Sequence, residues 1–137
     1  MEHFARLREM TQLKLLAIDD LQIVLTALKK VAEEIGYDVE ATQNPEQFKN
    51  LLRSFAPDLI LLDVIMPGED GLKLLQYVAQ EKVTAPVILI SDYGSELLKM
   101  VTKMGSAFGI DVRAVQKPLG PNSWRDLLAI EKARLRA

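Results

Sequence analysis

The sequence predicts an α/β protein, a single domain in which a parallel β-sheet carries helices on both faces. Short runs of consecutive apolar residues, typical of strands that are covered on both faces, alternate with segments of helical apolar spacing. The alternation repeats five times within residues 13–128, with no linker, internal repeat or low-complexity tract. Repeated strand–helix units favour parallel pairing through right-handed crossovers. The length of 137 residues suits one domain.

Five segments are predicted as strands. Three of them are uninterrupted apolar runs, at residues 15–18, 59–62 and 87–90. Two weaker candidates lie at residues 37–41 and 112–116. The three apolar runs suit strands that are covered on both faces, as in a parallel sheet.

Five segments with apolar residues three or four positions apart are predicted as helices. Their apolar stripes run from Val24 to Ile35, Phe48 to Phe55, Leu72 to Val78, Leu97 to Phe108 and Trp124 to Leu135. Each helix has a start or stop signal of the expected kind, except the third. These signals are Gly36 after the first helix, Asn44-Pro45 before the second, Ser95 and Gly109 around the fourth, and Gly120-Pro121 before the fifth.

Residues 1–12 precede the first strand and are expected to form a frayed N-terminal extension to a domain of residues 13–137. No segment approaches the length of an apolar membrane span, and the N-terminal residues lack the apolar run of a signal peptide. A cytoplasmic location without membrane contact is therefore expected.

Composition excludes several classes of function. Lys plus Arg is 17 and Asp plus Glu is 19, so the net charge of -2 lacks the basic excess of a direct nucleic-acid binder. The chain has no cysteine, which excludes disulfides, thiolate metal sites and cysteine nucleophiles. A histidine-based metal site or catalytic triad would have to be built on His3 alone.

Polar residues follow the predicted strands at one edge of the sheet. Asp19 and Asp20 end the first strand, Asp63 the third, Ser91 the fourth and Lys117 the fifth. Carboxyl ends of parallel strands share one edge, so these side chains are expected to converge. Three neighbouring carboxylates need a cation, and oxygen ligands alone favour Mg²⁺. A carboxylate can also accept a phosphoryl group, so the set predicts a site for phosphorylation of an aspartate.

At this point the sequence resembles the receiver domain of two-component response regulators. The matching stretches are 14–20 (KLLAIDD), 57–71 (PDLILLDVIMPGEDG), 90–91 (IS) and 117–118 (KP), and the resemblance covers about residues 13–130. The stretch after the third strand is the most specific of the four. The resemblance implies a flavodoxin-like (βα)5 doubly wound sheet with strand order 2-1-3-4-5.

The resemblance also implies how the site would hold a metal. Asp20 would bind Mg²⁺ directly, and Asp19 directly or through water. Asp63 and the backbone carbonyl of Ile65 would complete the share of the metal shell that the protein supplies.

For the phosphoryl group, the resemblance implies that Asp63 is the acceptor. Ser91 would sense the group and Lys117 would pair with it, and the bond to Pro118 is usually cis in this family. The donor would be a phosphohistidine of a sensor histidine kinase or a phosphotransfer protein, or a small acyl phosphate. The chain would be a signalling switch and not an enzyme in the usual sense. Phosphorylation would reshape the face formed by the fourth helix, the fifth strand and the fifth helix, which would bind an output domain or a second copy.

Three features depart from the common pattern of the family. Ala114 stands where most receivers carry Tyr or Phe, Asp92 follows Ser91 where a small residue is usual, and the stretch from Ser91 to Lys117 is a few residues long. In the length of this stretch and in the missing aromatic residue, the chain resembles receivers that are attached to EAL-type cyclic-di-GMP phosphodiesterase domains. No EAL domain lies in this chain.

Three alternatives accompany this prediction. A pseudo-receiver would keep the fold and the acidic site as a phosphorylation-independent interaction or dimerisation module. An aspartyl-phosphate hydrolase of the haloacid dehalogenase type would need an acid at position 65, where this chain has Ile65. A flavin-binding flavodoxin would need a phosphate loop after the first strand, where Asp19 and Asp20 would repel a phosphate.

Overall fold

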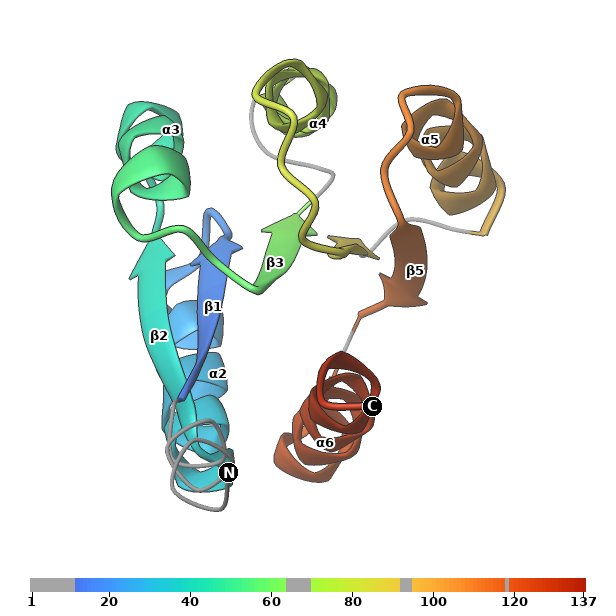
Figure 1. Ribbon diagram of the computed structural model, residues 1–137. Coiled ribbons are helices and arrows are strands. Elements are labelled where there is room, and N and C mark those ends of the chain that lie inside the picture. The colour runs from blue at the N-terminus through green and yellow to red at the C-terminus, as the bar shows by residue number, and fades with distance from the viewer. Residues whose placement is uncertain (1–11, 64–69, 92–94, 118) are drawn as a thin grey trace.

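The computed structural model describes residues 12–63, 70–91, 95–117 and 119–137 as one domain with a flavodoxin-like fold (Figure 1). The sheet has five parallel strands in the order β2-β1-β3-β4-β5, which confirms the predicted order. The strands are β1 (Leu13–Ile18), β2 (Tyr37–Thr42), β3 (Leu59–Asp63), β4 (Val87–Ser91) and β5 (Val112–Gln116). Each expected strand is present, with bounds that differ from the prediction by two residues at most.

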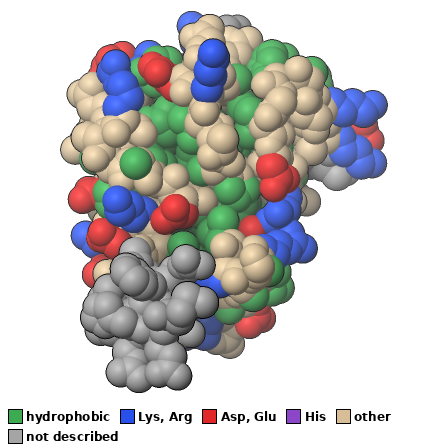
Figure 2. Space-filling model, viewed as in Figure 1, with side chains coloured by type: hydrophobic (Ala, Val, Ile, Leu, Met, Phe, Trp, Pro, Cys, Tyr) green, Lys and Arg blue, Asp and Glu red, His purple; other side chains and the backbone are tan. Residues whose placement is uncertain are grey.

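Helices cover both faces of the sheet, as predicted. They are α2 (Gln22–Ile35), α3 (Pro45–Ser54), α4 (Asp70–Gln80), α5 (Ser95–Ala107) and α6 (Pro121–Leu135). Helices α2 and α6 lie on one face, and α3, α4 and α5 lie on the other (Figure 1). None of the helices in the described ranges is long and apolar enough to cross a membrane. On the face viewed in Figure 2, charged side chains of both signs are interspersed among hydrophobic ones.

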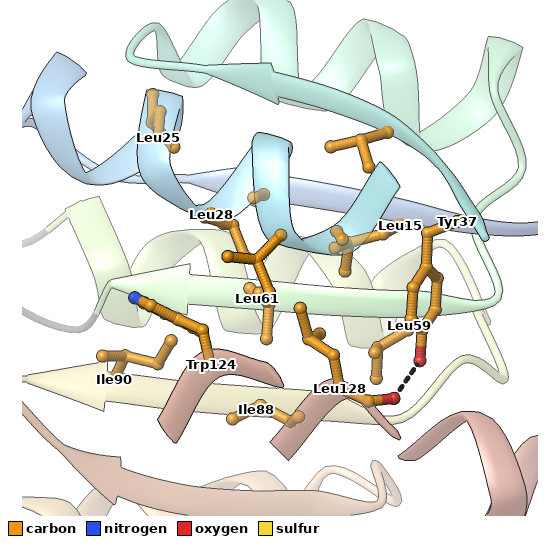
Figure 3. Close-up of a cluster of buried hydrophobic side chains, with 14 residues drawn as sticks. Leu15, Leu25, Leu28, Tyr37, Leu59, Leu61, Ile88, Ile90, Trp124 and Leu128 are labelled. Carbon is orange, nitrogen blue, oxygen red and sulfur yellow. Dashed lines mark hydrogen bonds between the residues drawn. The ribbon is translucent and has the colours of Figure 1, made fainter. Parts of the chain in front are cut away.

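The sheet separates two hydrophobic cores. Alternate residues of a strand point to opposite faces, so Leu16 and Ile18 of β1 pack beneath α3 and α4 while Leu15 and Ala17 pack beneath α2 and α6. Figure 3 shows the second core, where Trp124 of α6 lies among side chains of β3, β4 and α2. Strands β3 and β4 are buried at every position, which is why their sequences are continuous apolar runs.

Capping residues fix the ends of several helices. Gly36 has a φ of 106°, in the left-handed region that favours glycine, and its amide donates to the carbonyl oxygens of Ala32 and Glu33. Asn44 caps α3, because its side chain accepts a hydrogen bond from the amide of Gln47. Gly109 follows the last turn of α5. The side chain of Ser95, a predicted cap, lies outside the described residues.

The buried helix faces differ in detail from the predicted stripes. In α2 the buried residues include Leu25 and Ala32, whereas Val24 and Ile35 are only partly buried. The predicted stripe thus faces the core, and Leu25 and Ala32 widen the buried face of the helix. Phe108 was predicted on the stripe of the fourth helix, but α5 ends at Ala107 and Phe108 is 36% exposed.

Polar contacts tie α6 to α2 and β2. The hydroxyl of Tyr37 donates to the backbone oxygen of Leu128 at 2.7 Å (Figure 3), and burial raises the pKa of Tyr37 above its ordinary value. The Nζ of Lys132 donates to the backbone oxygen of Ile35 at 2.6 Å and so caps the end of α2. These bonds hold α6 against the end of α2 and the start of β2.

A buried acid also joins α6 to β5. Glu131 is 2% exposed and forms ion pairs with Arg113 of β5 and with Arg134. The hydrogen bond that Arg113 donates to the carboxylate of Glu131 raises the pKa of Arg113 above its ordinary value. Arg113 and Val115 therefore belong to the α6 side of β5, and Val112, Ala114 and Gln116 belong to the α5 side.

Gly105 lets α5 approach β5 closely. A Cβ atom at position 105 would lie 2.3 Å from Cγ2 of Val112 and 3.2 Å from its Cβ, distances too short for an ordinary contact. A glycine in a helix interior costs about 0.5–1 kcal/mol relative to alanine, so its position here is explained by packing.

We expect Gly105→Ala to destabilise the protein by about 1–2 kcal/mol, although it raises the intrinsic helix propensity of α5, because overpacking outweighs propensity. Urea denaturation measures the difference. Ser106→Ala, an exposed neighbour on the same helix, is the matched control, and Val112→Ala in the Gly105→Ala background should restore part of the loss. Increased stability of Gly105→Ala alone would contradict the close approach.

Candidate functional site

The predicted polar cluster forms at the carboxyl edge of the sheet. Asp19 follows β1 directly, Asp63 and Ser91 are the last residues of β3 and β4, and Lys117 follows β5 directly. The register brings these ends level, since Ile18 pairs with Leu62 and Ser91 pairs with Gln116. Each side chain of the cluster is thus positioned by a strand whose apolar residues are locked in the cores.

The centre of the site is a buried ion-pair network. The Nζ of Lys117 lies 2.7 Å from Oδ2 of Asp19 and 3.4 Å from Oδ2 of Asp63. The side chains of Lys117, Asp19 and Asp63 are 7%, 6% and 4% exposed, respectively. Charges so far from water require partners, and one ammonium here serves two carboxylates. The shorter contact of Lys117 is with Asp19, which sequence reasoning did not predict.

The three aspartates can supply one cation with oxygen ligands. Ligand atoms of Asp19, Asp20 and Asp63 lie within 4.8 Å of one another. Asp20 is exposed, whereas Asp19 uses one oxygen for Lys117 and the other to accept a hydrogen bond from the amide of Leu21 at 2.9 Å. This donor set fits a small hard cation such as Mg²⁺, which keeps several waters and takes few protein ligands. Asp20 is the carboxylate of the three that solvent reaches most easily.

Ser91 is fully buried at the end of β4. Its backbone oxygen accepts a hydrogen bond from the amide of Lys117 at 2.8 Å, so the serine and the lysine of the ion-pair network are held together. Three other residues of the sequence analysis, Ile65, Asp92 and Pro118, lie outside the described residues. Ala114 is described and is exposed on β5.

A small apolar hollow lies beside the ion pairs. It has a volume of about 250 Å³, and Leu21, Ile23, Trp124 and Lys117 are among the residues that line it. Leu21 is 47% exposed and Ile23 is 79% exposed, whereas Trp124 is buried in the core, as expected for a packing residue. Sequence reasoning missed this rim, although apolar residues directly after Asp19 and Asp20 were the signal that could have found it.

The fold and the site together define a class of protein: a doubly wound α/β domain with an acidic, lysine-balanced pocket at the carboxyl edge of its sheet. The family model described as "Response regulator receiver domain" matches residues 15–128 of the chain. The chain therefore belongs to the family of response regulator receiver domains. Domains of this family are signalling switches that interact with histidine kinases or phosphotransfer proteins and bind Mg²⁺ at an acidic pocket.

Similar proteins agree with this assignment. The chain is 32% identical over 123 residues to the alkaline phosphatase synthesis transcriptional regulatory protein PhoP of Bacillus subtilis (strain 168), a match that covers 90% of this chain and 48% of PhoP. The chain thus spans about half the length of that relative.

Among solved structures, a response regulator from Colwellia psychrerythraea is 30% identical, with a TM-score of 0.78, and the match covers 90% of this chain and 99% of that one. A CheY-like receiver domain protein from Methanospirillum hungatei JF-1 is 25% identical, with a TM-score of 0.77, and the match covers 92% and 95%. Both likenesses extend over nearly the whole of each chain.

We expect Lys117→Gln to destabilise the protein by roughly 3 kcal/mol, because it leaves Asp19 and Asp63 buried without their common cation. Chemical denaturation in the presence of a chelator measures the loss. Lys30→Gln, on the exposed face of α2, is the matched control. Asp19→Asn in the Lys117→Gln background should restore part of the stability, and a loss no larger than that of the control would refute the network.

Proposed function

We propose that residues 13–137 act as a phosphorylation-controlled receiver in which Asp63 accepts a phosphoryl group, with residues 1–12 as an extension. The observation that carries the proposal is a buried carboxylate, Asp63, beside two further aspartates and one lysine at the carboxyl edge of a parallel sheet. Buried charge in such an arrangement costs stability, so its presence favours a functional role.

The chemistry assigns one role to each group. An oxygen of Asp63 attacks the phosphorus atom of a phosphohistidine, and an acyl phosphate forms as the bond between phosphorus and nitrogen breaks. The electron pair returns to the imidazole, which takes up a proton. Lys117, 3.4 Å from Oδ2 of Asp63, balances the added charge, and Ser91 donates a hydrogen bond to a phosphoryl oxygen.

Asp20, Asp63 and the backbone carbonyl of Ile65 would hold Mg²⁺, with Asp19 bound directly or through water. The ion supplies positive charge beside the phosphoryl oxygens. Because Lys117 and the amide of Leu21 already engage both oxygens of Asp19, we favour binding of this residue through water.

The phosphodonor is proposed to be a sensor histidine kinase or a phosphotransfer protein. Asp63 is 4% exposed, so a donor has to reach its carboxylate past the rim of the site. The exposed apolar side chains of Leu21 and Ile23 stand on that rim and suit a protein surface. Their position supports a donor that docks over the start of α2.

The output is proposed to act through the face of α5, β5 and α6, by binding an output domain or a second copy. Attachment to an EAL-type cyclic-di-GMP phosphodiesterase domain stays a prediction that rests on sequence features alone. The PhoP relative is, by its name, a transcriptional regulatory protein. That name describes the whole of PhoP, of which this chain matches 48%.

A pseudo-receiver is the second candidate, and one observation favours it. Ala114 is exposed on β5, so position 114 offers no ring whose rotation could relay phosphorylation to the surface. The fold and the acidic site would then serve an interaction that does not depend on phosphorylation.

Intact mass spectrometry with acetyl phosphate and Mg²⁺ separates the two functions. We expect one phosphoryl adduct on the wild-type protein and none on Asp63→Asn, because an amide cannot form the acyl phosphate. Asp38→Asn, which alters an exposed aspartate of β2, is the matched control and should keep the adduct. An unmodified wild type, together with no spectral response to beryllofluoride, would favour the pseudo-receiver.

Metal binding can be followed through Trp124, the only tryptophan, because it lines the same hollow as Lys117. We expect Mg²⁺ to change its fluorescence and Asp20→Asn to weaken the apparent affinity by about tenfold or more, since it removes an accessible ligand. Asp126→Asn, an exposed change on α6, provides the control. Equal affinities for wild type and Asp20→Asn would exclude Asp20 as a ligand.

A further inference from the structure

The turn between β2 and α3 lies beside the acidic end of β1. The amide of Asp19 donates to the backbone oxygen of Thr42 at 3.3 Å, which continues the pairing of β1 with β2 beyond the end of the strand. The side-chain Nε2 of Gln43 donates to the backbone oxygen of Asp20 at 2.8 Å. Two consecutive residues of the turn thus contact the two consecutive aspartates that follow β1.

The turn has a well-defined backbone of its own. Thr42 is 4% exposed, and its Oγ1 accepts a hydrogen bond from the amide of Asn44 at 3.0 Å and donates one to Oε1 of Gln47. The side chain of Asn44 accepts a further hydrogen bond from the amide of Gln47 at 3.0 Å. Phe48, in the first turn of α3, is fully buried in the core. The side chain of Gln43 therefore extends from a backbone that packing and hydrogen bonds hold in place.

Asp20 is held differently from the other two candidate metal ligands. Lys117 lies within ion-pair distance of Asp19 and of Asp63, and both of these carboxylates are buried. Asp20 is exposed, and its carboxylate forms no ion pair with another residue in the described ranges. The hydrogen bond from Gln43 reaches its backbone, so it restrains the residue without using the oxygens that a cation would bind.

We propose that Gln43 is a positioning residue of the metal site, which holds the backbone of Asp20 so that its carboxylate faces the site and favours Mg²⁺ over the larger Ca²⁺. The inference rests on the proposed function, because it takes Asp20 as a metal ligand. Groups that orient a ligand commonly affect metal affinity strongly. The hydrogen bond itself is exposed and adds little to folding, because water competes for both of its partners.

The size of the cation makes the expected effect selective. Mg²⁺ needs near-ideal octahedral geometry with ligands at about 2.0–2.1 Å, whereas Ca²⁺ accepts irregular shells at about 2.3–2.6 Å. A ligand whose backbone is held suits the stricter ion, and a ligand that can move adapts to the larger one. Loss of the hydrogen bond from Gln43 should therefore cost more Mg²⁺ affinity than Ca²⁺ affinity.

The test compares metal affinities of variants at position 43. Mg²⁺ and, separately, Ca²⁺ are titrated into isotope-labelled protein, and the backbone NMR signals of Asp20 and Leu21 give the dissociation constants. We expect Gln43→Leu to weaken Mg²⁺ binding by about three- to tenfold and Ca²⁺ binding by less than about twofold. Gln43→Asn keeps the amide but shortens the side chain, so it should behave like Gln43→Leu. In the wild type, Mg²⁺ should also shift the side-chain amide signals of Gln43.

Two controls separate positioning from a structural role. Gln80→Leu, an exposed change at the end of α4, is the matched control and should leave both affinities unchanged. Thermal unfolding of the metal-free proteins should give midpoints for wild type and Gln43→Leu that agree to within about 2 °C, because an exposed side chain adds little to stability. With excess Mg²⁺ the wild type should become the more stable of the two, since it binds the ion more tightly.

Three results would overturn the inference alone. They are equal Mg²⁺ affinity of Gln43→Leu and wild type, an equal loss of affinity for Mg²⁺ and Ca²⁺, and a marked loss of stability in the metal-free variant. In each of these cases Asp20→Asn should still weaken Mg²⁺ binding, and the proposed metal site would stand. A wild type that binds no Mg²⁺ would overturn the proposed metal site together with the role of Gln43.

Discussion

The charge balance at the carboxyl edge of the sheet is the constraint on which the rest of the structure depends. Two carboxylates, Asp19 and Asp63, are almost fully buried, and the ammonium of Lys117 lies within ion-pair distance of both. Repulsion between the two acids would be severe in this environment without a cation, since water is largely excluded. Lys117 therefore has to reach across the sheet from β5 towards β1. Both the packing of the core and the charge balance of the site therefore depend on where β5 lies.

The apolar cores supply the rigidity that such a site needs. Strands β3 and β4 are buried at every position, so the residues at their ends cannot move without disturbing packing on both faces. Helix α6 is held in turn by the Tyr37 hydrogen bond and by the buried Glu131, which pairs with Arg113 of β5. The network around Glu131 and the ion pairs around Lys117 thus both act on β5, one near its start and one just past its end.

Much of the fold and of the site could be predicted because strong local patterns carry them. Continuous apolar runs predicted three of the strands, and the shared edge of a parallel sheet predicted that Asp63 and Lys117 converge. The finer geometry depends on packing, which no local pattern encodes. The pairing of Lys117 with Asp19 and the burial of Leu25 in α2 depend on the positions of neighbouring elements. Glu131 also escaped prediction, because a glutamate on a terminal helix ordinarily faces solvent.

Ala114 is exposed on β5 and lines a groove beside α5. A small residue in the floor of a groove removes an internal contact between α5 and β5, so fewer interactions within the domain oppose a change in their relative position. The same small residue opens space that another molecule can fill. A receiver built in this way would transmit a change at Asp63 through the end of β5, where Gln116 directly precedes Lys117.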